Sequence, residues 1–309
     1  MPHHSYEFDD HTFDDDDAYE SFGKRKDKRR PKGKRSVKAL TNSSKNINPT
    51  GHGDAQNSEK RFDDVGLQNL YEQGYIEELL EEIKSGKEAT VYKAKGPQGY
   101  VAAKLYRDSS VRSFKADYHY SEGRFISRGR RKRVLNTASK AEISPELAFW
   151  VQHEYDQLWQ LHQAGIAVPR PIIEPRSGDM VLAGRVVLME FIGDEEAAPR
   201  LSDCSLSAPQ LADAFEQAVG LYQGMLELGR VHADFSAFNL LYWQERVIAI
   251  DFPQMIHVDE NRQALQFIEQ DLRSLLSSFA SLGYQADEDR VLQACLDKVD
   301  LIALKRGRK

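Results

Sequence analysis

The pattern of apolar and polar residues divides the chain into a polar N-terminal region and a patterned remainder. Residues 1–62 are rich in Asn, Gly, Ser and Lys and show no apolar period. Such a segment cannot bury enough apolar surface to offset the entropy cost of ordering it. We therefore predict a disordered tail over residues 1–62, and a folded region after it where apolar residues recur with helix and strand periods.

Strand patterns dominate the first part of the folded region. Residues 67–75 indicate a short helix, and two strand-like runs follow, EEIKSGKEATVYKA (81–94) and GYVAAKLY (99–106), separated by turn residues. A later apolar run, VVLMEFIG (186–193), reads as a buried strand that leads into a connection. The intervening residues 107–140 are polar and basic, which predicts a long loop or a partly mobile insertion.

A helix is predicted to begin after Ser144, a suitable N-cap with Pro145 at the first helical position. Glu154 falls on the apolar stripe of this helix. By itself, that position indicates a boundary site with solvent access rather than a buried carboxylate. The stripe consists of Leu147, Val151, Leu158 and Leu161.

A second long helix is predicted after a capping box formed by Ser207 and Gln210. Strand patterns thus concentrate before about residue 192 and helix patterns after it. This predicts an α+β fold of two lobes, residues 63–192 and 193–309, with a ligand cleft between them. The inward face of the second helix is predicted to carry Leu211, Phe215, Val219, Tyr222 and Leu226.

The stretch VHADFSAFNLLYWQERVIAIDF (231–252) places carboxylates beside apolar segments that cannot solvate them, so a partner or a metal ion must compensate their charge. Asn239 follows Asp234 by five residues, and a predicted strand pair returns Asp251 beside Asn239. This ordered set suits phosphoryl transfer, in which one aspartate orients the attacking hydroxyl while an asparagine and a second aspartate hold magnesium on the phosphates. We predict a kinase-like site here that uses ATP with Mg²⁺ or Mn²⁺, and we interpret His232 as structural.

Two upstream segments fit the same chemistry. Lys104 ends an apolar strand, where it either snorkels to the surface or points into the cleft. An inward Lys104 would explain Glu154, and the pair would position the α- and β-phosphates. The phosphate cover is predicted at Ser85-Gly86-Lys87, where one glycine permits close backbone approach and the flanking side chains add donors.

Three motifs, SGKEATVY (85–92), HADFSAFN (232–239) and IDFPQ (250–254), together resemble the RIO family of atypical serine/threonine protein kinases. The resemblance spans about residues 66–300. It implies a protein-kinase-like fold with a trimmed C-terminal lobe. Only about twenty residues separate Asp251 from a helix that contains Asp271, which leaves no room for a long activation segment.

The resemblance also implies roles for single residues. Asp234 would be the catalytic base, Asn239 and Asp251 the metal ligands, and Lys104 the phosphate-binding lysine. Asp251 would have a second catalytic role, because family members are proposed to accept phosphate transiently on the matching aspartate. The main chain of Glu190, Phe191 and Ile192 would be the hinge that reads adenine.

Charge and cysteine usage narrow the function classes. The net charge of −6 argues against bulk nucleic-acid affinity, but the basic residues 24–38 form either a solvated tail or an RNA contact. Cys204 and Cys295 show neither metal-site spacing nor a disulfide framework. The chain has no apolar run of membrane-spanning length and no signal-peptide pattern, so we expect no membrane partner and a cytoplasmic location.

Four functions remain open at this point. The first is an ATP- and magnesium-dependent serine/threonine kinase that phosphorylates a protein substrate, itself included. The second is a small-molecule kinase of the aminoglycoside or choline type, and the third is an ATPase switch acting on a ribosomal precursor or RNA particle. The fourth is a non-catalytic adaptor. SGKEATVY and the Pro253-Gln254 pair favour the first, and the intact set of site residues disfavours the fourth.

Overall fold

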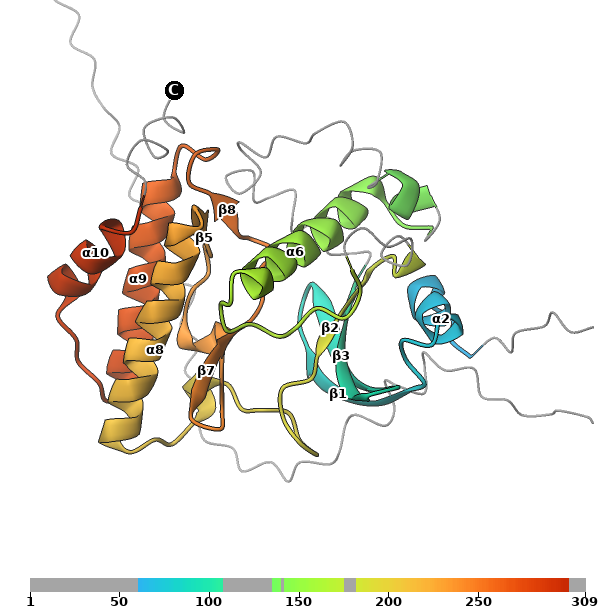
Figure 1. The fold of residues 1–309 in the computed structure, drawn as a ribbon, viewed down its shortest axis with the longest axis horizontal. Coiled ribbons are helices and arrows are strands. Elements are labelled where there is room, and N and C mark those ends of the chain that lie inside the picture. The colour runs from blue at the N-terminus through green and yellow to red at the C-terminus, as the bar shows by residue number, and fades with distance from the viewer. Residues whose placement is uncertain (1–60, 108–134, 140–141, 175–181, 300–309) are drawn as a thin grey trace, which may run out of the picture. The chain divides into compact units, whose positions relative to one another are not determined.

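The structure, a computed structural model, describes residues 61–107, 135–139, 142–174 and 182–299 (Figure 1). All of them belong to one compact unit, Gly33–Lys309. Of the predicted tail, only Arg61 and Phe62 fall within the described residues. Phe62 is fully buried and packs edge-to-face on Tyr71, with ring centroids 5.9 Å apart. The prediction of disorder up to residue 62 is therefore wrong at its end, because the core already includes Phe62.

A four-stranded antiparallel sheet forms the first half of the described fold, in the order β1-β2-β3-β4. The run 81–94 was predicted as one strand-like run, but it forms parts of two strands. The turn between them is closed by the Gly86 N–H, which donates to the Ala89 carbonyl at 2.9 Å. The elements are the helix α2 (Val65–Glu72) and the strands β1 (Glu78–Ser85), β2 (Ala89–Gly96), β3 (Gly99–Tyr106) and β4 (Val186–Glu190).

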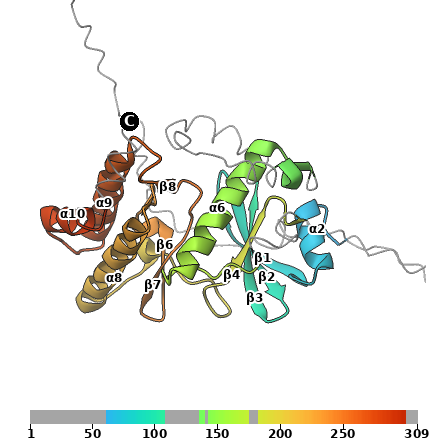
Figure 2. The ribbon, with the colours of Figure 1, turned by 45° about the horizontal axis from the view of Figure 1, so that its top comes forward.

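Helix α6 (Pro145–Gln163) begins as the sequence predicts, with Ser144 Oγ accepting a hydrogen bond from the Leu147 N–H at 3.1 Å. The four apolar residues of its predicted stripe are buried, and Glu154 is only 2% exposed. The boundary interpretation of Glu154 is therefore wrong. Figures 1 and 2 show α6 between the sheet and the C-terminal helices.

The predicted insertion at 107–140 is described only in part. Residues 135–139 are helical where a loop was predicted, and Thr137 and Ala138 are buried. The rest of the insertion lies outside the described residues, apart from Arg107.

The second half of the fold is mainly helical. The predicted strand pair exists as an antiparallel hairpin that pairs Leu240 with Ala249. The predicted capping interaction also exists, with the Ser207 N–H donating to Gln210 Oε1 at 3.1 Å. The elements are η2 (Leu201–Asp203), α8 (Ala208–Glu227), β5 (Arg230–Val231), η3 (Ala237–Asn239), β6 (Leu240–Trp243), β7 (Arg246–Ala249), β8 (Ile256–His257), α9 (Ala264–Ser281) and α10 (Glu288–Leu296).

These elements confirm the predicted α+β class, with an antiparallel sheet followed by helices. The short connection from Asp251 to α9, which starts at Ala264, agrees with the absence of a long activation segment. The lobe boundary at residue 192 stays a prediction. In the part of the chain that the structure describes, no helix has both the length and the apolar character needed to cross a membrane.

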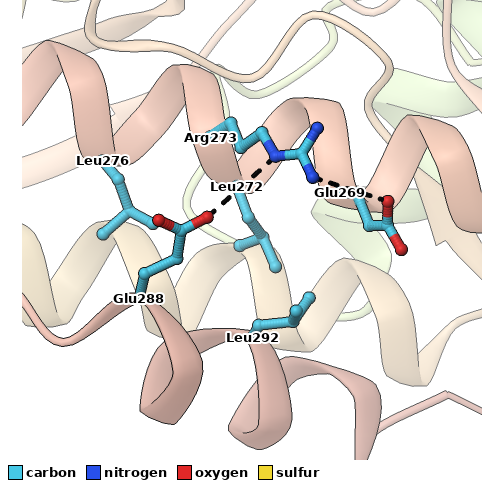
Figure 3. A pocket seen from close by; sticks show the side chains of 6 residues that line it. All are labelled: Glu269, Leu272, Arg273, Leu276, Glu288 and Leu292. Carbon is cyan, nitrogen blue, oxygen red and sulfur yellow. Dashed lines mark ion pairs between the residues drawn. The ribbon is translucent and has the colours of Figure 1, made fainter.

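A small hollow lies between α9 and α10 (Figure 3). Arg273 reaches Glu269 at 3.9 Å and Glu288 at 4.0 Å across its mouth. Exposed ion pairs of this length contribute little to stability. We assign the hollow no role. Its lining residues are Glu269, Leu272, Arg273, Leu276, Glu288 and Leu292.

Candidate active site

Lys104 lies in the sheet and meets a carboxylate from α6. Its Cα pairs with those of Val91 on β2 and Val187 on β4, so the backbone is fixed on both sides. The Lys104 Nζ donates to Glu154 Oε1 at 2.6 Å, and both residues are buried. The structure thus contains the predicted contact, and the snorkelling alternative for Lys104 is wrong.

The same ammonium also meets Asp251 from the segment after β7. The Lys104 Nζ lies 2.6 Å from Asp251 Oδ1. Burial by itself would lower the pKa of Lys104, but the carboxylates of Asp251 and Glu154 outweigh it and raise that pKa well above its usual value. Desolvation would raise the pKa of Asp251, but the Lys104 ammonium holds it below its usual range. Both groups therefore stay ionised at neutral pH.

Tyr106 is a member of this cluster that sequence reasoning missed. Its hydroxyl donates to Glu154 Oε2, and its ring centroid lies 5.1 Å from the Lys104 Nζ. The two oxygens of Glu154 are thus held by different donors, which fixes the carboxylate plane. Tyr106 follows Lys104 on the same face of β3, two positions along, and that alternation is the signal that could have found it.

The loop that carries Asp234 is hydrogen-bonded to the carboxylate of Asp271, a residue of α9. The backbone N–H groups of Ala233 and Phe235 each donate to the Asp271 carboxylate at 2.8 Å, and the Tyr222 hydroxyl donates at 2.9 Å. Ala233 has a φ of 67°, a strained conformation for a residue with a side chain. The Asp271 carboxylate therefore stabilises a backbone geometry that places Asp234. Burial raises the pKa of Asp271 to about 7 against the effect of these hydrogen bonds.

Asp234 and Asn239 form a second linked pair. Asn239 Nδ2 donates to the Asp234 main-chain carbonyl at 2.9 Å and to its Oδ2 at 2.8 Å. Because the amide nitrogen is used in this way, Oδ1 is the Asn239 atom able to bind a cation. Desolvation raises the pKa of Asp234, the Asn239 hydrogen bond opposes that rise, and the charge of Asp251 adds to it.

The backbone also brings Asn239 and Asp251 together as predicted. The Ile250 N–H donates to the Asn239 carbonyl at 3.0 Å. Asp251 then adopts a φ of 74°, the left-handed region that Asp tolerates better than most residues. Its side chain is 44% exposed, so one face stays open to solvent although Lys104 covers another.

His232 is fully buried, and its hydrogen bond is made to the main chain. Its Nε2 lies 3.3 Å from the Ile250 carbonyl, and its ring packs edge-to-face against Phe235 and Phe252, each at 5.4 Å. Burial lowers the pKa of His232 to about 4. A neutral imidazole that links two chain segments agrees with the structural interpretation.

The predicted phosphate cover sits at the β1–β2 turn, where Ser85 and Lys87 are exposed. Ser85 Oγ accepts a hydrogen bond from Arg107 Nη2 at 2.5 Å, and the same nitrogen donates to Thr90 Oγ1 at 3.1 Å. Arg107 therefore adds a positive charge to this turn that sequence reasoning missed. In the sequence it is the first residue of the predicted insertion at 107–140.

The predicted hinge begins at Glu190, the last residue of β4. The Glu190 N–H donates to the Arg170 carbonyl at 2.8 Å, and the Ile192 carbonyl accepts from the Ala198 N–H at 2.8 Å. These two main-chain groups are occupied. The adenine contact of residues 190–192 stays a prediction from the sequence.

A family model for the RIO domain matches residues 90–291. The chain belongs to the RIO domain family. The matched range includes Lys104, Glu154, Asp234, Asn239 and Asp251, all described above, while it begins after Ser85 and Lys87. The resemblance carried by the three sequence motifs is thereby confirmed.

Named relatives agree with the RIO domain assignment. The chain is 33% identical over 206 residues to serine/threonine-protein kinase RIO1 of Caenorhabditis elegans, covering 65% of this chain and 37% of that protein. It is 29% identical over 238 residues to RIO-type serine/threonine-protein kinase Rio1 of Haloferax volcanii, covering 75% and 74%. It is 31% identical over 216 residues to the human RIO1 protein, covering 69% and 35%. The chain thus spans about a third of the length of the two animal relatives.

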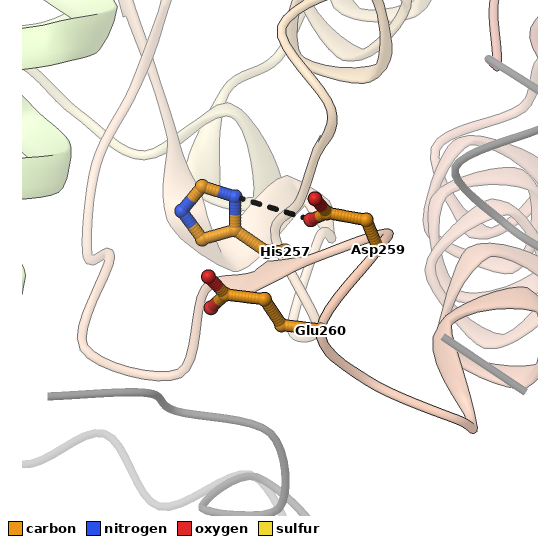
Figure 4. Close-up of side chains that lie close together, drawn as sticks. All are labelled: His257, Asp259 and Glu260. Carbon is orange, nitrogen blue, oxygen red and sulfur yellow. Dashed lines mark ion pairs between the residues drawn. The ribbon is translucent and has the colours of Figure 1, made fainter. Parts of the chain in front are cut away.

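One further cluster lies outside the RIO domain site just described. His257, Asp259 and Glu260 could bring three ligand atoms together, and His257 Nδ1 lies 3.8 Å from Asp259 Oδ1 (Figure 4). Both carboxylates are exposed. We assign this cluster no role, because exposed acidic groups near a histidine are common without an ion, and a surface contact of 3.8 Å contributes little to stability.

Proposed function

We propose that this RIO domain transfers the γ-phosphoryl group of ATP to serine or threonine hydroxyls of a protein, itself included. The observation that carries the proposal is the Lys104 ammonium, held at 2.6 Å by both Glu154 and Asp251. A lysine fixed in this way is oriented to bind phosphate oxygens. The names of the relatives, which are serine/threonine-protein kinases, support the same activity.

The residues present fit a divalent cation. Asn239 Oδ1 and the partly exposed Asp251 carboxylate are oxygen donors, which hard cations such as Mg²⁺ prefer. We propose magnesium as the physiological ion, with manganese as a substitute. When bound, such an ion neutralises charge on the β- and γ-phosphates.

The chain's own side chains would divide the remaining work. The acceptor hydroxyl oxygen forms a bond to the γ-phosphorus while the bond from that phosphorus to the β–γ bridging oxygen breaks. The hydroxyl proton passes to the carboxylate of Asp234, whose position Asn239 fixes and whose raised pKa suits a general base. Lys104 holds the nucleotide phosphates, and the main chain of residues 190–192 receives adenine.

The test of this proposal is the Asp234→Ala variant. Loss of a general base is expected to lower turnover by roughly 10²–10⁴-fold. Nucleotide affinity should stay near that of the wild type, because this group acts mainly in the transition state. Transfer of labelled phosphate to serine by Asp234→Ala at the wild-type rate would refute the assignment.

The alternative of an ATPase switch rests on Asp251, whose exposed carboxylate could accept phosphate transiently. The same labelling experiment separates the two functions. A kinase leaves acid-stable phosphoserine or phosphothreonine on itself or on a partner. Label that appears only as free phosphate, or as a base-labile acyl phosphate lost in Asp251→Asn, would favour the ATPase.

We also propose that the basic residues 24–38, which lie outside the described residues, contact RNA, such as that of a ribosomal particle. Deleting residues 1–60 should weaken RNA binding and flatten its salt dependence, because lost phosphate contacts release fewer counterions. An unchanged salt slope would make the tail a solubilising segment. A cytoplasmic location stays a prediction from the sequence.

A further inference from the structure

Lys93 is a buried lysine that the proposed chemistry does not use. It lies on β2 and is only 3% exposed, although lysines in strands normally keep their ammonium in water. The Lys93 Nζ donates to the main-chain carbonyl of Glu195 and lies 3.4 Å from that of Asp194. These two acceptors are about a hundred residues away in the sequence. The contact therefore ties a strand of the sheet to the segment that follows the predicted hinge.

Two aromatic rings complete the surroundings of this ammonium. The Lys93 Nζ lies 3.8 Å from the ring centroid of Tyr100 and 4.8 Å from that of Phe191. The rings meet edge-to-face, with centroids 5.9 Å apart. The Tyr100 hydroxyl also donates to Glu195 Oε2 at 3.3 Å. A cation held over two ring faces and by carbonyl oxygens is well stabilised, which explains how the lysine can be buried.

The segment that Lys93 holds is a tight loop, residues 193–198, which we call the linker loop. It closes where the Ala198 N–H donates to the Ile192 carbonyl at 2.8 Å. Gly193 opens it with a φ of 139°, and a Cβ there would lie 2.2 Å from the Glu196 carbonyl oxygen. The loop is therefore restricted in shape, and its carbonyls at 194 and 195 turn toward β2.

We propose that Lys93 is a positioning residue for the nucleotide, which clamps the linker loop to β2 and so fixes the hinge at residues 190–192. One contact and one strand pairing join the clamp to the site. Phe191 belongs to the hinge itself, and Val91, two positions before Lys93, pairs with Lys104 across the sheet. The clamp thus sets the spacing between the strand that leads to the phosphates and the segment that receives adenine. The inference rests on the proposed function, because it assumes that ATP binds there.

The clamp should act on binding rather than on chemistry. A linker loop released from β2 would have to be ordered again by each nucleotide that binds, and that entropy cost reduces affinity. The reacting groups, Lys104, Asp234 and Asp251, do not touch Lys93. Once nucleotide is bound, the transfer step should proceed nearly as before.

The experiment compares Lys93→Met with the wild type in the full-length chain. Methionine keeps the apolar length and removes the charge, and the dissociation constant for Mg-ADP, measured by isothermal titration, should rise about tenfold, as loss of one charge-assisted hydrogen bond predicts. Lys95→Met is the matched control. Lys95 lies on the same strand but is exposed and pairs with Glu77 at 2.7 Å, so the affinity of Lys95→Met for Mg-ADP should match that of the wild type.

Two readouts separate positioning from a general loss of folding. Hydrogen exchange of the Ala198 amide should accelerate in Lys93→Met, while amides of β3 and α6 keep wild-type rates. The KM for ATP should rise while the single-turnover transfer rate at saturating ATP changes little. Equal losses of affinity and transfer rate, or faster exchange throughout the sheet, would make Lys93 a folding residue and overturn the proposal.

Tyr100→Leu keeps the inference testable if Lys93→Met does not fold. It removes one ring of the clamp at a partly exposed position and leaves Lys93 in place, so the dissociation constant should rise about two- to fivefold, the range for loss of one exposed cation–π contact. An unchanged value would overturn the clamp. If the wild type binds no Mg-ADP, the proposed function fails. Hydrogen exchange of the Ala198 amide would still show whether Lys93 holds the linker loop.

Discussion

Asp271 offers the sharpest test of how the fold supports the site. Its carboxylate accepts hydrogen bonds from the Ala233 N–H, the Phe235 N–H and the Tyr222 hydroxyl, and it is 1% exposed. Asp271→Asn is nearly isosteric but leaves a single acceptor oxygen. At least one buried donor would then face an amide NH₂ group instead of an acceptor.

The expected cost follows from these contacts. A buried donor left unsatisfied costs about 1–3 kcal/mol, so we expect Asp271→Asn to lower the free energy of unfolding by about 1–3 kcal/mol. Turnover should fall as well. The strained backbone at Ala233 would relax and shift Asp234, and a displacement of about 1 Å in a catalytic group can reduce rates by about 10²-fold.

Urea unfolding followed by tryptophan fluorescence measures the stability change, and phosphoryl transfer is compared under conditions where both proteins are folded. Tyr222→Phe is the matched control, since it removes one donor and leaves both backbone hydrogen bonds. It should cost about 1 kcal/mol with turnover close to the wild type. Full turnover in Asp271→Asn would refute the idea that this carboxylate positions the loop.

Three further predictions follow from the site. In a double-mutant cycle on turnover, Lys104→Ala and Glu154→Gln should show losses that do not add, because each residue acts through the other. Additive losses would mean that the two residues act independently. Asp251→Asn should lose most metal-dependent ATP binding, and a titration with ATP and magnesium like that of the wild type would contradict the metal assignment. The pKa of His232, lowered from 6.5 to about 4 by burial, means that the unfolded chain binds a proton first as the pH falls. The stability due to neutral His232 is thus present above pH 6.5 and is lost, by roughly 3 kcal/mol, as the pH falls through 4. His232→Phe should remove this loss. The raised pKa of Asp271 makes stability change with pH in the opposite direction, but this contribution is the same in both proteins and cancels when their free energies of unfolding are subtracted.

Features encoded within a few residues could be predicted from the sequence. The cap at Ser144, the hairpin that returns Asp251 to Asn239, and the capping interaction at Ser207 depend on local backbone preferences and short spacings. Glu154 shows a second kind of signal. A carboxylate on an apolar helical stripe was ambiguous by itself, and it became informative once a lysine was available to oppose it.

Asp271 carries the same signal as Glu154. Asp271 lies among the buried residues of α9, beside Ile268, Leu272 and Leu275, so a buried carboxylate could have been inferred from the stripe. Its partners could not, because two of them are backbone N–H groups in a loop whose conformation is not encoded in α9. Lys93 gave no signal, since a lysine in a strand is ordinarily solvated and its acceptors lie about a hundred residues further along the chain.

The residues that could be predicted and those that could not differ in what they do. Lys104, Asp234, Asn239 and Asp251 would contact the reacting groups, and their chemistry restricts the residue type and hence leaves a pattern. The supporting contacts meet a different requirement. They only have to supply a hydrogen-bond partner to a carboxylate, to a loop in a strained conformation or to a carbonyl of the linker loop. Many residue types can do that from many positions, so such contacts leave little pattern in the sequence. This is why the structure adds most where the site is held in place, at Asp271 beneath the loop of Asp234 and at the linker loop beside the hinge.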